Sequence, residues 1–242
     1  MHITRLYRIT GIFAIILPLL SAALFMTLQT VFDFPGILRE PVGVALSLFA
    51  QNQDAIIPAY YLFAWTGILF IPLVILLHQI MEQKTSVVLN IATVLGIIAG
   101  VVQFLGFIRW PFMIPSLAQA YIDPAAANSM KEAISVTYNA FNLYAGGAIG
   151  EHLGYVFQSG WGIMFATVLL NLRFGPRLLA WFGILMSVAL FISGYEQLIP
   201  SQAEALASLN LVAVIGWQVW LLVMGVVLLK RPTVQSPLSY SN

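Results

Sequence analysis

The sequence lacks cysteine and contains few charged residues, and each shortage excludes a class of protein. Without cysteine there can be no disulfide, no thiolate metal site and no cysteine nucleophile. Charged residues make up 8% of the chain, whereas a soluble domain usually carries about 25%. Because hydrophobic residues make up 60%, the composition predicts a protein whose partner is the lipid bilayer.

Several familiar signals are also missing from the sequence. A net charge of +1 without a basic patch argues against a nucleic-acid partner. There is no phosphate loop, dinucleotide fingerprint or Gly-x-Ser-x-Gly elbow. His78 and His152 are expected about 30 Å apart in depth, too far to share a haem, and no His-Glu-x-x-His spacing suggests zinc. We therefore expect no cofactor and no metal.

Six intervals of 18 to 27 residues contain no Asp, Glu, Lys or Arg. A spanning helix needs about 17–25 apolar residues, and a backbone in hydrocarbon must satisfy its own hydrogen bonds, which favours helices. The first interval is too long for the apolar part of a signal peptide, so we interpret it as a retained span. We predict an all-α, six-helix transmembrane bundle forming a single membrane domain over residues 1–242. The expected spans are residues 9–31, 56–79, 86–108, 149–171, 177–196 and 208–229.

Two of the connections are predicted to contain helices. Pro41 follows Glu40 and favours a short interfacial helix through about Gln51. Asp123-Pro124 is a helix-start signature, and the residues after it alternate between an apolar and a polar face at helical spacing. We expect an amphipathic helix at about 124–144, lying on the membrane surface between spans 3 and 4. Its polar stripe consists of Lys131, Ser135, Asn139 and Asn142.

The basic residues are distributed unequally between the two sides that six spans create. The side with both termini carries seven Lys or Arg, and the other side carries three. Because basic residues near the spans mark the cytoplasmic face, both termini are predicted to be cytoplasmic. The seven residues are Arg5, Arg8, Lys84, Arg173, Arg177, Lys230 and Arg231.

Glycines four residues apart predict close helix packing. Gly96 and Gly100 have this spacing in span 3, and Gly146, Gly150 and Gly154 have it near the start of span 4. Small residues at such spacing let two backbones approach closely in lipid. The alternative is that glycine is simply common in membrane helices.

Several stretches resemble one family of bacterial membrane proteins. They are Arg-Trp-Pro-Phe-Met-Ile-Pro at 109–115, Ala-Tyr at 120–121, Gly-Glu-His-Leu-Gly-Tyr at 150–155, Tyr-Arg-Ile-Thr-Gly at 7–11 and Phe-Pro-Gly-Ile-Leu-Arg at 34–39. The family is known as domain of unknown function 4386, and the resemblance covers about residues 5–230. It implies a multi-pass protein of the bacterial inner membrane. It assigns no activity and therefore no catalytic residues.

Two polar landmarks lie at the edges of apolar runs, where ionisable groups are costly enough to need a reason. One is Arg109 after span 3, and the other is the pair Glu151-His152 at the start of span 4. We expect a desolvated Arg109–Glu151 ion pair at the floor of an outward-opening pocket. The predicted ligand-binding residues are Arg109, Glu151, His152, Gln103, Tyr155 and Gln158.

The sequence leaves several alternatives open at this site. The ion pair could simply fasten span 3 to span 4, and His152 could bond a loop carbonyl instead of carrying a proton or a metal. The function favoured by the sequence is binding of a small or lipophilic ligand, or of a partner membrane protein. A small carrier is the second hypothesis. An intramembrane enzyme using Glu151 and His152 as acid and base is the third, because Arg109 would lower the carboxyl pKa that such an acid needs raised.

Overall fold

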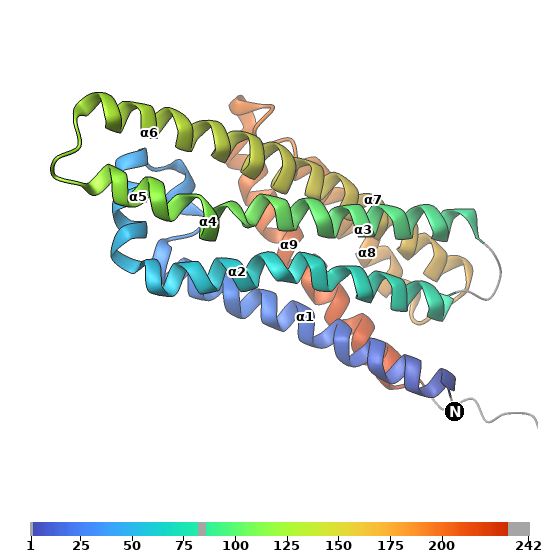
Figure 1. Ribbon diagram of the computed structural model, residues 1–242. Coiled ribbons are helices and arrows are strands. Elements are labelled where there is room, and N and C mark those ends of the chain that lie inside the picture. Colours follow the sequence, from blue (N-terminus) through green and yellow to red (C-terminus); the bar gives the residue numbers. More distant parts are fainter. Residues whose placement is uncertain (1, 82–85, 232–242) are drawn as a thin grey trace, which may run out of the picture.

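The computed structural model describes residues 2–81 and 86–231, and every regular element in that part of the chain is a helix. The expected all-α bundle is confirmed (Figure 1). Five continuous helical runs are long and apolar enough to cross a membrane, and α8 is a shorter apolar helix of 17 residues. The chain is therefore a multi-pass membrane protein. Its long elements are α1 (His2–Phe32), α2 (Val42–Met81), α3 (Val87–Phe107), α7 (Gly154–Asn171), α8 (Arg177–Ser193) and α9 (Ala203–Leu229).

Two of the runs extend far beyond the predicted spans. Helix α3 continues through α4 (Arg109–Phe112) and α5 (Ile114–Ile122), giving a run of 36 residues. A second run of 44 residues joins α6 (Asn128–Phe141), a π-helix η2 (Asn142–Leu153) and α7. At 1.5 Å per residue these runs are about 54 and 66 Å long, whereas the hydrocarbon core is about 30 Å thick. Both runs must therefore project well beyond the bilayer.

The amphipathic helix between spans 3 and 4 exists, but it does not lie separately on the membrane surface. It begins at Asn128 and leads without a break into span 4, alongside the run from α3 to α5 (Figure 1). Ile134 and Tyr138 on its apolar face are buried within the protein. The predicted start at Asp123 is wrong, since α6 begins at Asn128. Asp123 instead lies in the turn between α5 and α6, where its Oδ1 accepts a hydrogen bond from the Ala125 N–H.

The short helix expected after Pro41 is the first part of α2. The helix bends at Asn52, which has φ −121° and ψ 18°, and then continues as span 2. Leu46 and Phe49 are fully buried, so the apolar face of this segment packs inside the protein and not in the membrane interface. Two short 3₁₀ helices, η1 (Gly36–Arg39) and η3 (Pro200–Gln202), complete the connections.

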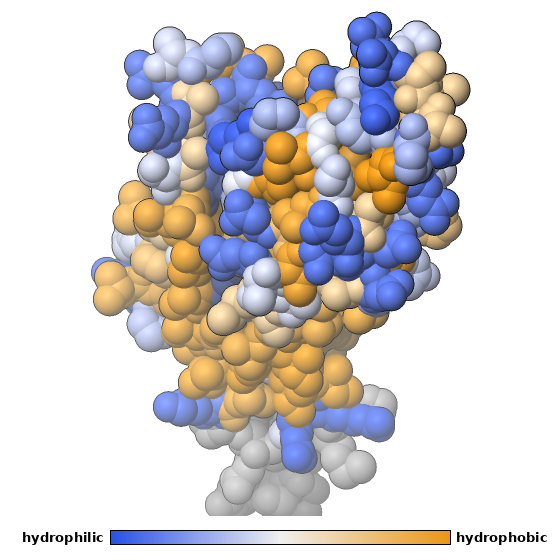
Figure 2. Space-filling model, turned by 90° about the vertical axis from the view of Figure 1, so that its left-hand side faces the viewer, coloured by the Kyte–Doolittle hydropathy of each residue, from blue (hydrophilic) through white to orange (hydrophobic). Residues whose placement is uncertain are grey.

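The bundle has two different ends. One end, called here the terminal end, holds the start of α1, the end of α9 and the α7–α8 turn (Figure 1). The predicted turn with Glu82 and Lys84 lies outside the described residues. The opposite end, called here the cap end, holds η1 and the α5–α6 turn. Figure 2 looks at the molecule from this side and shows hydrophilic residues interspersed with apolar ones in its upper part, above a largely apolar zone.

The buried apolar residues form two separate cores. One core surrounds Trp161, Trp217 and Trp220 and is formed by the spanning parts of α1, α2, α3, α7, α8 and α9. The other, called here the cap core, joins the end of α1, η1 and the first part of α2 to α4, α5 and α6. The cap core consists of Leu28, Phe32, Phe34, Ile37, Ala45, Leu46, Phe49, Ile56, Ala59, Tyr60, Trp110, Ile114, Ala118, Ile134 and Tyr138.

Glycine allows two close backbone contacts in the bundle. A Cβ at Gly67 of α2 would lie 2.7 Å from the Gly100 carbonyl oxygen of α3. A Cβ at Gly150 of η2 would lie 2.8 Å from the Cα of Gly106 in α3. Real Cβ atoms do not approach this closely, so at Gly100 and Gly150 the predicted close packing of helices is confirmed.

Candidate functional site

Arg109 lies at the junction between α3 and α4, about 33 Å along the helix axis from Val87. Its side chain is only 8% exposed. The guanidinium donates one hydrogen bond to the Gly106 carbonyl and another, of 2.8 Å, to Oδ1 of Asn142 in η2. It also lies 5.2 Å from the centroid of the Trp110 ring. Neutral oxygens and an aromatic ring thus hold a buried positive charge.

Glu151 lies at a similar level, about 30 Å from the end of α7. Its Oε2 accepts a 3.0 Å hydrogen bond from the side-chain amide of Gln197. The predicted direct ion pair with Arg109 is wrong, because the described residues contain one ion pair within 4.0 Å, and it joins Arg39 to Glu196. The two residues still lie on neighbouring segments, because α3 and η2 touch at Gly106 and Gly150.

Two adjacent glycines of the π-helix explain these partners. A Cβ at Gly146 would overlap the Arg109 guanidinium, and a Cβ at Gly147 would overlap the Gln197 carboxamide. Each glycine therefore makes room for a polar side chain from another element. In a π-helix, hydrogen bonds run from residue i to i+5, and such segments are frequent at functional sites. The wider turn changes the direction in which Glu151 points relative to α7.

Four hydrogen-bond donors around the guanidinium have no acceptor among the described residues. They are Nε of Arg109, Nε1 of Trp110 and the hydroxyls of Tyr60 and Tyr138. Tyr60 stacks on Trp110 with ring centroids 4.8 Å apart, and Tyr138 meets the same ring edge-on at 6.3 Å. Burying an unpartnered donor costs about 1–3 kcal/mol. This concentration of donors therefore favours an acceptor that is not part of the chain.

His152 faces the connection between α8 and α9. Its Nδ1 lies 2.7 Å from the Gly194 carbonyl oxygen, and its ring packs edge-on against Tyr195 at 5.2 Å. A carbonyl oxygen can only accept a hydrogen bond, so in this contact Nδ1 of His152 is the donor. His152 thus has a carbonyl partner, which the sequence analysis gave as the alternative to carrying a proton or a metal, and the contact anchors the connection.

The three remaining predicted residues form two hydrogen-bonded groups deeper in the bundle. Gln103 of α3 donates to Gln158 of α7. The Tyr155 hydroxyl lies 3.5 Å from Oδ1 of Asn210, whose amide donates to Ser193 at 3.0 Å. The six predicted residues are thus distributed over several neighbouring contacts.

Sequence reasoning missed four members of this region as site residues: Asn142, Gln197, Tyr60 and Tyr138. Asn142 was placed in the polar stripe of the surface helix, where its position next to Arg109 was not apparent. Gln197 lies in a connection, and its partner Glu151 is 46 residues away. The two tyrosines look like ordinary packing residues in the sequence, and only the burial of their hydroxyls distinguishes them.

Comparison with known families identifies the chain. The model of the family described as "Domain of unknown function (DUF4386)" matches residues 9–225. The chain belongs to this family. The membership expected from the Arg-Trp and Gly-Glu-His motifs is thereby confirmed. Comparisons with curated proteins and with solved structures gave no match.

In this DUF4386 chain the α8–α9 connection, residues 194–202, covers Glu151 and His152. Besides the contacts of Gly194 and Gln197, it carries Glu196, whose Oε1 lies 2.5 Å from Nη2 of Arg39 in η1. The Arg39 side chain is 58% exposed. The connection is therefore fixed to η1 and to η2 by separate polar contacts.

The Arg39–Glu196 ion pair should contribute little to stability. We expect Arg39→Ala to lower the unfolding free energy by less than about 1 kcal/mol, because water screens exposed pairs. Unfolding of the purified protein in mixed micelles measures the change. A loss of more than about 2 kcal/mol would contradict this, and would mean that the whole connection is released when the pair is broken.

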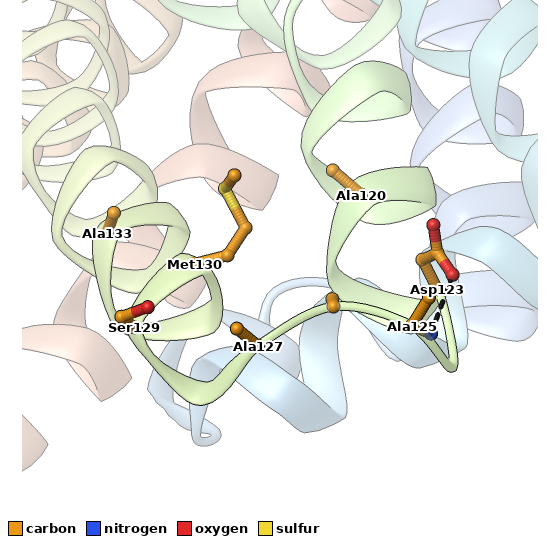
Figure 3. A pocket seen from close by; sticks show the side chains of 8 residues that line it. Ala120, Asp123, Ala125, Ala127, Ser129, Met130 and Ala133 are labelled. Carbon is orange, nitrogen blue, oxygen red and sulfur yellow. Dashed lines mark hydrogen bonds between the residues drawn. The ribbon is translucent and has the colours of Figure 1, made fainter.

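A separate hollow of about 530 Å³ lies at the tip of the cap end, between α5 and α6 (Figure 3). Small side chains and Met130 line it, and Asp123 lies at its edge with its carboxylate bonded to the Ala125 backbone. None of the six predicted ligand-binding residues lines this hollow. Within residues 2–81 and 86–231, no three His, Asp or Glu side chains are grouped so that they could hold a metal ion.

Proposed function

We propose that this protein is a membrane-embedded binding protein that holds a small or lipophilic molecule at Arg109 and Glu151. The observation that carries the proposal is a buried guanidinium that has no carboxylate partner within residues 2–81 and 86–231, together with three more donors that have no acceptor there. Burying a hydrogen-bond donor without an acceptor costs free energy of folding, and ionisable groups near hydrocarbon usually mark functional sites. A bound molecule that supplies the missing acceptors would offset this cost.

We also propose the bacterial inner membrane as the location, with both termini cytoplasmic and the cap end outside. The support is the excess of basic residues at the terminal end, where the described part of the chain has six Lys or Arg against three towards the cap end. In this orientation Arg109 and Glu151 lie at the level of the outer headgroups. A molecule could then reach them from the outer leaflet or from the outside solution.

A small carrier is the second candidate, and one specific observation favours it. Polar groups continue inward from Glu151 to Tyr155 of α7 and Asn210 of α9, and Asn210 also donates to Ser193 at the end of α8. Below them, however, the core is formed by the tryptophans and aliphatic residues of the spanning bundle. A carrier would need this apolar part to open, so binding remains the function that the geometry supports best.

The test is ligand-induced stabilisation of the purified protein. A panel of short-chain phospholipids and of small anionic, zwitterionic and neutral solutes is added, and the midpoint of thermal unfolding is recorded. A ligand at 100 times its Kd stabilises by about 2.7 kcal/mol, which corresponds to a rise of about 5–10 °C for a chain of this size.

We expect the rise to disappear in Arg109→Gln and to be reduced in Arg109→Lys, which keeps the charge but not the planar fork. Lys131→Gln is the control, because Lys131 is another cap-end cation, which lies over the Tyr121 ring and away from Arg109. A ligand that stabilises wild type and Arg109→Gln equally would show that binding does not involve this site. No stabilisation by any member of the panel would contradict the proposal itself.

A further inference from the structure

The two charges of the site are opposite in sign, buried or half-buried, and bonded to neutral groups instead of to each other. Arg109 is held by the Gly106 carbonyl and Asn142, and Glu151 is held by Gln197. They lie on facing segments, because α3 and η2 touch through Gly106 and Gly150. A site of this kind has no net charge but has a positive side and a negative side.

The neutral partners indicate what each side would take from a ligand. On the Arg109 side, the guanidinium uses carbonyl and amide oxygens as acceptors, and Tyr60, Tyr138 and Trp110 add donors. This side suits a group with several anionic oxygens. On the Glu151 side, an amide N–H of Gln197 is the donor. An ammonium N–H could take its place and would bring a full opposite charge.

We infer that the ligand is zwitterionic, with an anionic phosphate or carboxylate for Arg109 and a primary ammonium for Glu151. This inference rests on the proposed function and names the ligand class for it. A simple anion at Arg109 would be repelled by Glu151, and a simple cation at Glu151 would be repelled by Arg109, whereas a zwitterion satisfies both charges. Two sources have this chemistry: an ethanolamine phospholipid headgroup and a free amino compound such as phosphoethanolamine or an amino acid.

The position of the site is compatible with either source. Arg109 lies about 33 Å from the start of α3, just beyond one hydrocarbon thickness of about 30 Å. The Gln197–Glu151 bond is exposed, so a ligand can exchange with Gln197 without unfolding a helix. The α8–α9 connection would shift outward as the ammonium replaces the amide.

Binding of short-chain phospholipids with identical acyl chains tests the inference. Dihexanoyl phosphatidylethanolamine, phosphatidylglycerol and phosphatidylcholine are titrated into the purified protein, and calorimetry gives each Kd. A charge-assisted hydrogen bond contributes about 1.5–3 kcal/mol, so we expect the ethanolamine lipid to bind about tenfold or more tighter than the other two. Phosphoethanolamine and glycine, titrated separately, show whether a headgroup or amino acid without chains is enough.

Glu151→Gln should remove this preference while keeping the side chain's shape and its ability to accept from Gln197. Glu196→Gln is the matched control, because its carboxylate pairs with Arg39 in the same connection, and it should keep the tenfold preference. Tight binding of phosphoethanolamine or glycine supports a soluble zwitterion, and tight binding of the lipid alone supports a headgroup.

Two results would overturn the inference. One is equal affinity for the ethanolamine and glycerol lipids in wild type, and the other is a preference that survives in Glu151→Gln. If phosphatidylglycerol or a neutral solute binds and Arg109→Gln abolishes that binding, the zwitterionic class is wrong but the proposed binding function stands. If no compound binds in an Arg109-dependent way, both proposals fail.

Discussion

Gly106→Ala is expected to lower the unfolding free energy by about 3 kcal/mol, although it adds a single methyl group. The new Cβ would overlap the backbone of Gly150, so η2 would have to move away from α3. Overpacking usually costs about 1–3 kcal/mol, and the upper end applies here because backbone cannot move aside as a flexible side chain does. Unfolding by sodium dodecyl sulfate in mixed micelles measures the loss.

Gly160→Ala is the control for this prediction. Its Cβ would meet only the side chain of Leu95, at 2.9 Å from Cδ1 and 3.9 Å from Cγ, and the end of this side chain is flexible. Alanine also favours a helix by about 1 kcal/mol over glycine, so this variant should be close to wild type or slightly more stable. If the two variants unfold at the same detergent fraction, the contact between Gly106 and Gly150 is not a close one in the protein.

The sequence was sufficient for the parts of the fold that depend on local chemistry. Each long apolar run became a helix, because hydrocarbon leaves the backbone no other partner. The glycine spacing at Gly100 and Gly150 predicted close packing, and both residues lie at such contacts. The family motifs identified the right family. These signals come from residues whose effect does not depend on distant partners.

The long helices at the cap end could not be predicted as readily. The predicted span 3 ended before Arg109 because the charge-free interval ends there, but the helical run continues past it, and Pro111 and Pro115 lie near the starts of its next segments, α4 and α5. Proline is tolerated in a first turn because its missing N–H has no helical acceptor there. The helix therefore resumes after each proline, and the Asp123 turn, not the membrane surface, reverses the chain.

The partners of the two charges depend on features that the sequence does not reveal. The prediction assumed 3.6 residues per turn around Glu151, whereas residues 142–153 form a π-helix. That change in register places Asn142 beside Arg109, and Gln197 reaches Glu151 over Gly147. Opposite charges in a low dielectric attract, but helix rotation and the space left by glycines decide which atoms meet.

Gly146→Ala is expected to abolish ligand binding at Arg109 although it replaces no charged residue. Its Cβ would occupy the space of the guanidinium, which must then give up its bond to Asn142 and leave the donor cluster. Arg109 is buried and surrounded by ring systems, so we expect a further loss of about 1–3 kcal/mol in unfolding free energy. The helical fold should persist, because the clash is with a side chain and not with backbone.

A double-mutant cycle distinguishes this mechanism from general damage. If Gly146→Ala acts by displacing the guanidinium, adding it to Arg109→Gln, which has a shorter side chain, should cost much less than it costs wild type. Residues in contact typically show coupling energies of about 0.5–3 kcal/mol. Gly154→Ala, whose Cβ would lie 3.1 Å from the flexible Gln103 side chain, should be additive with Arg109→Gln and should keep binding. Full additivity for Gly146→Ala would mean that this glycine does not make the space that Arg109 occupies.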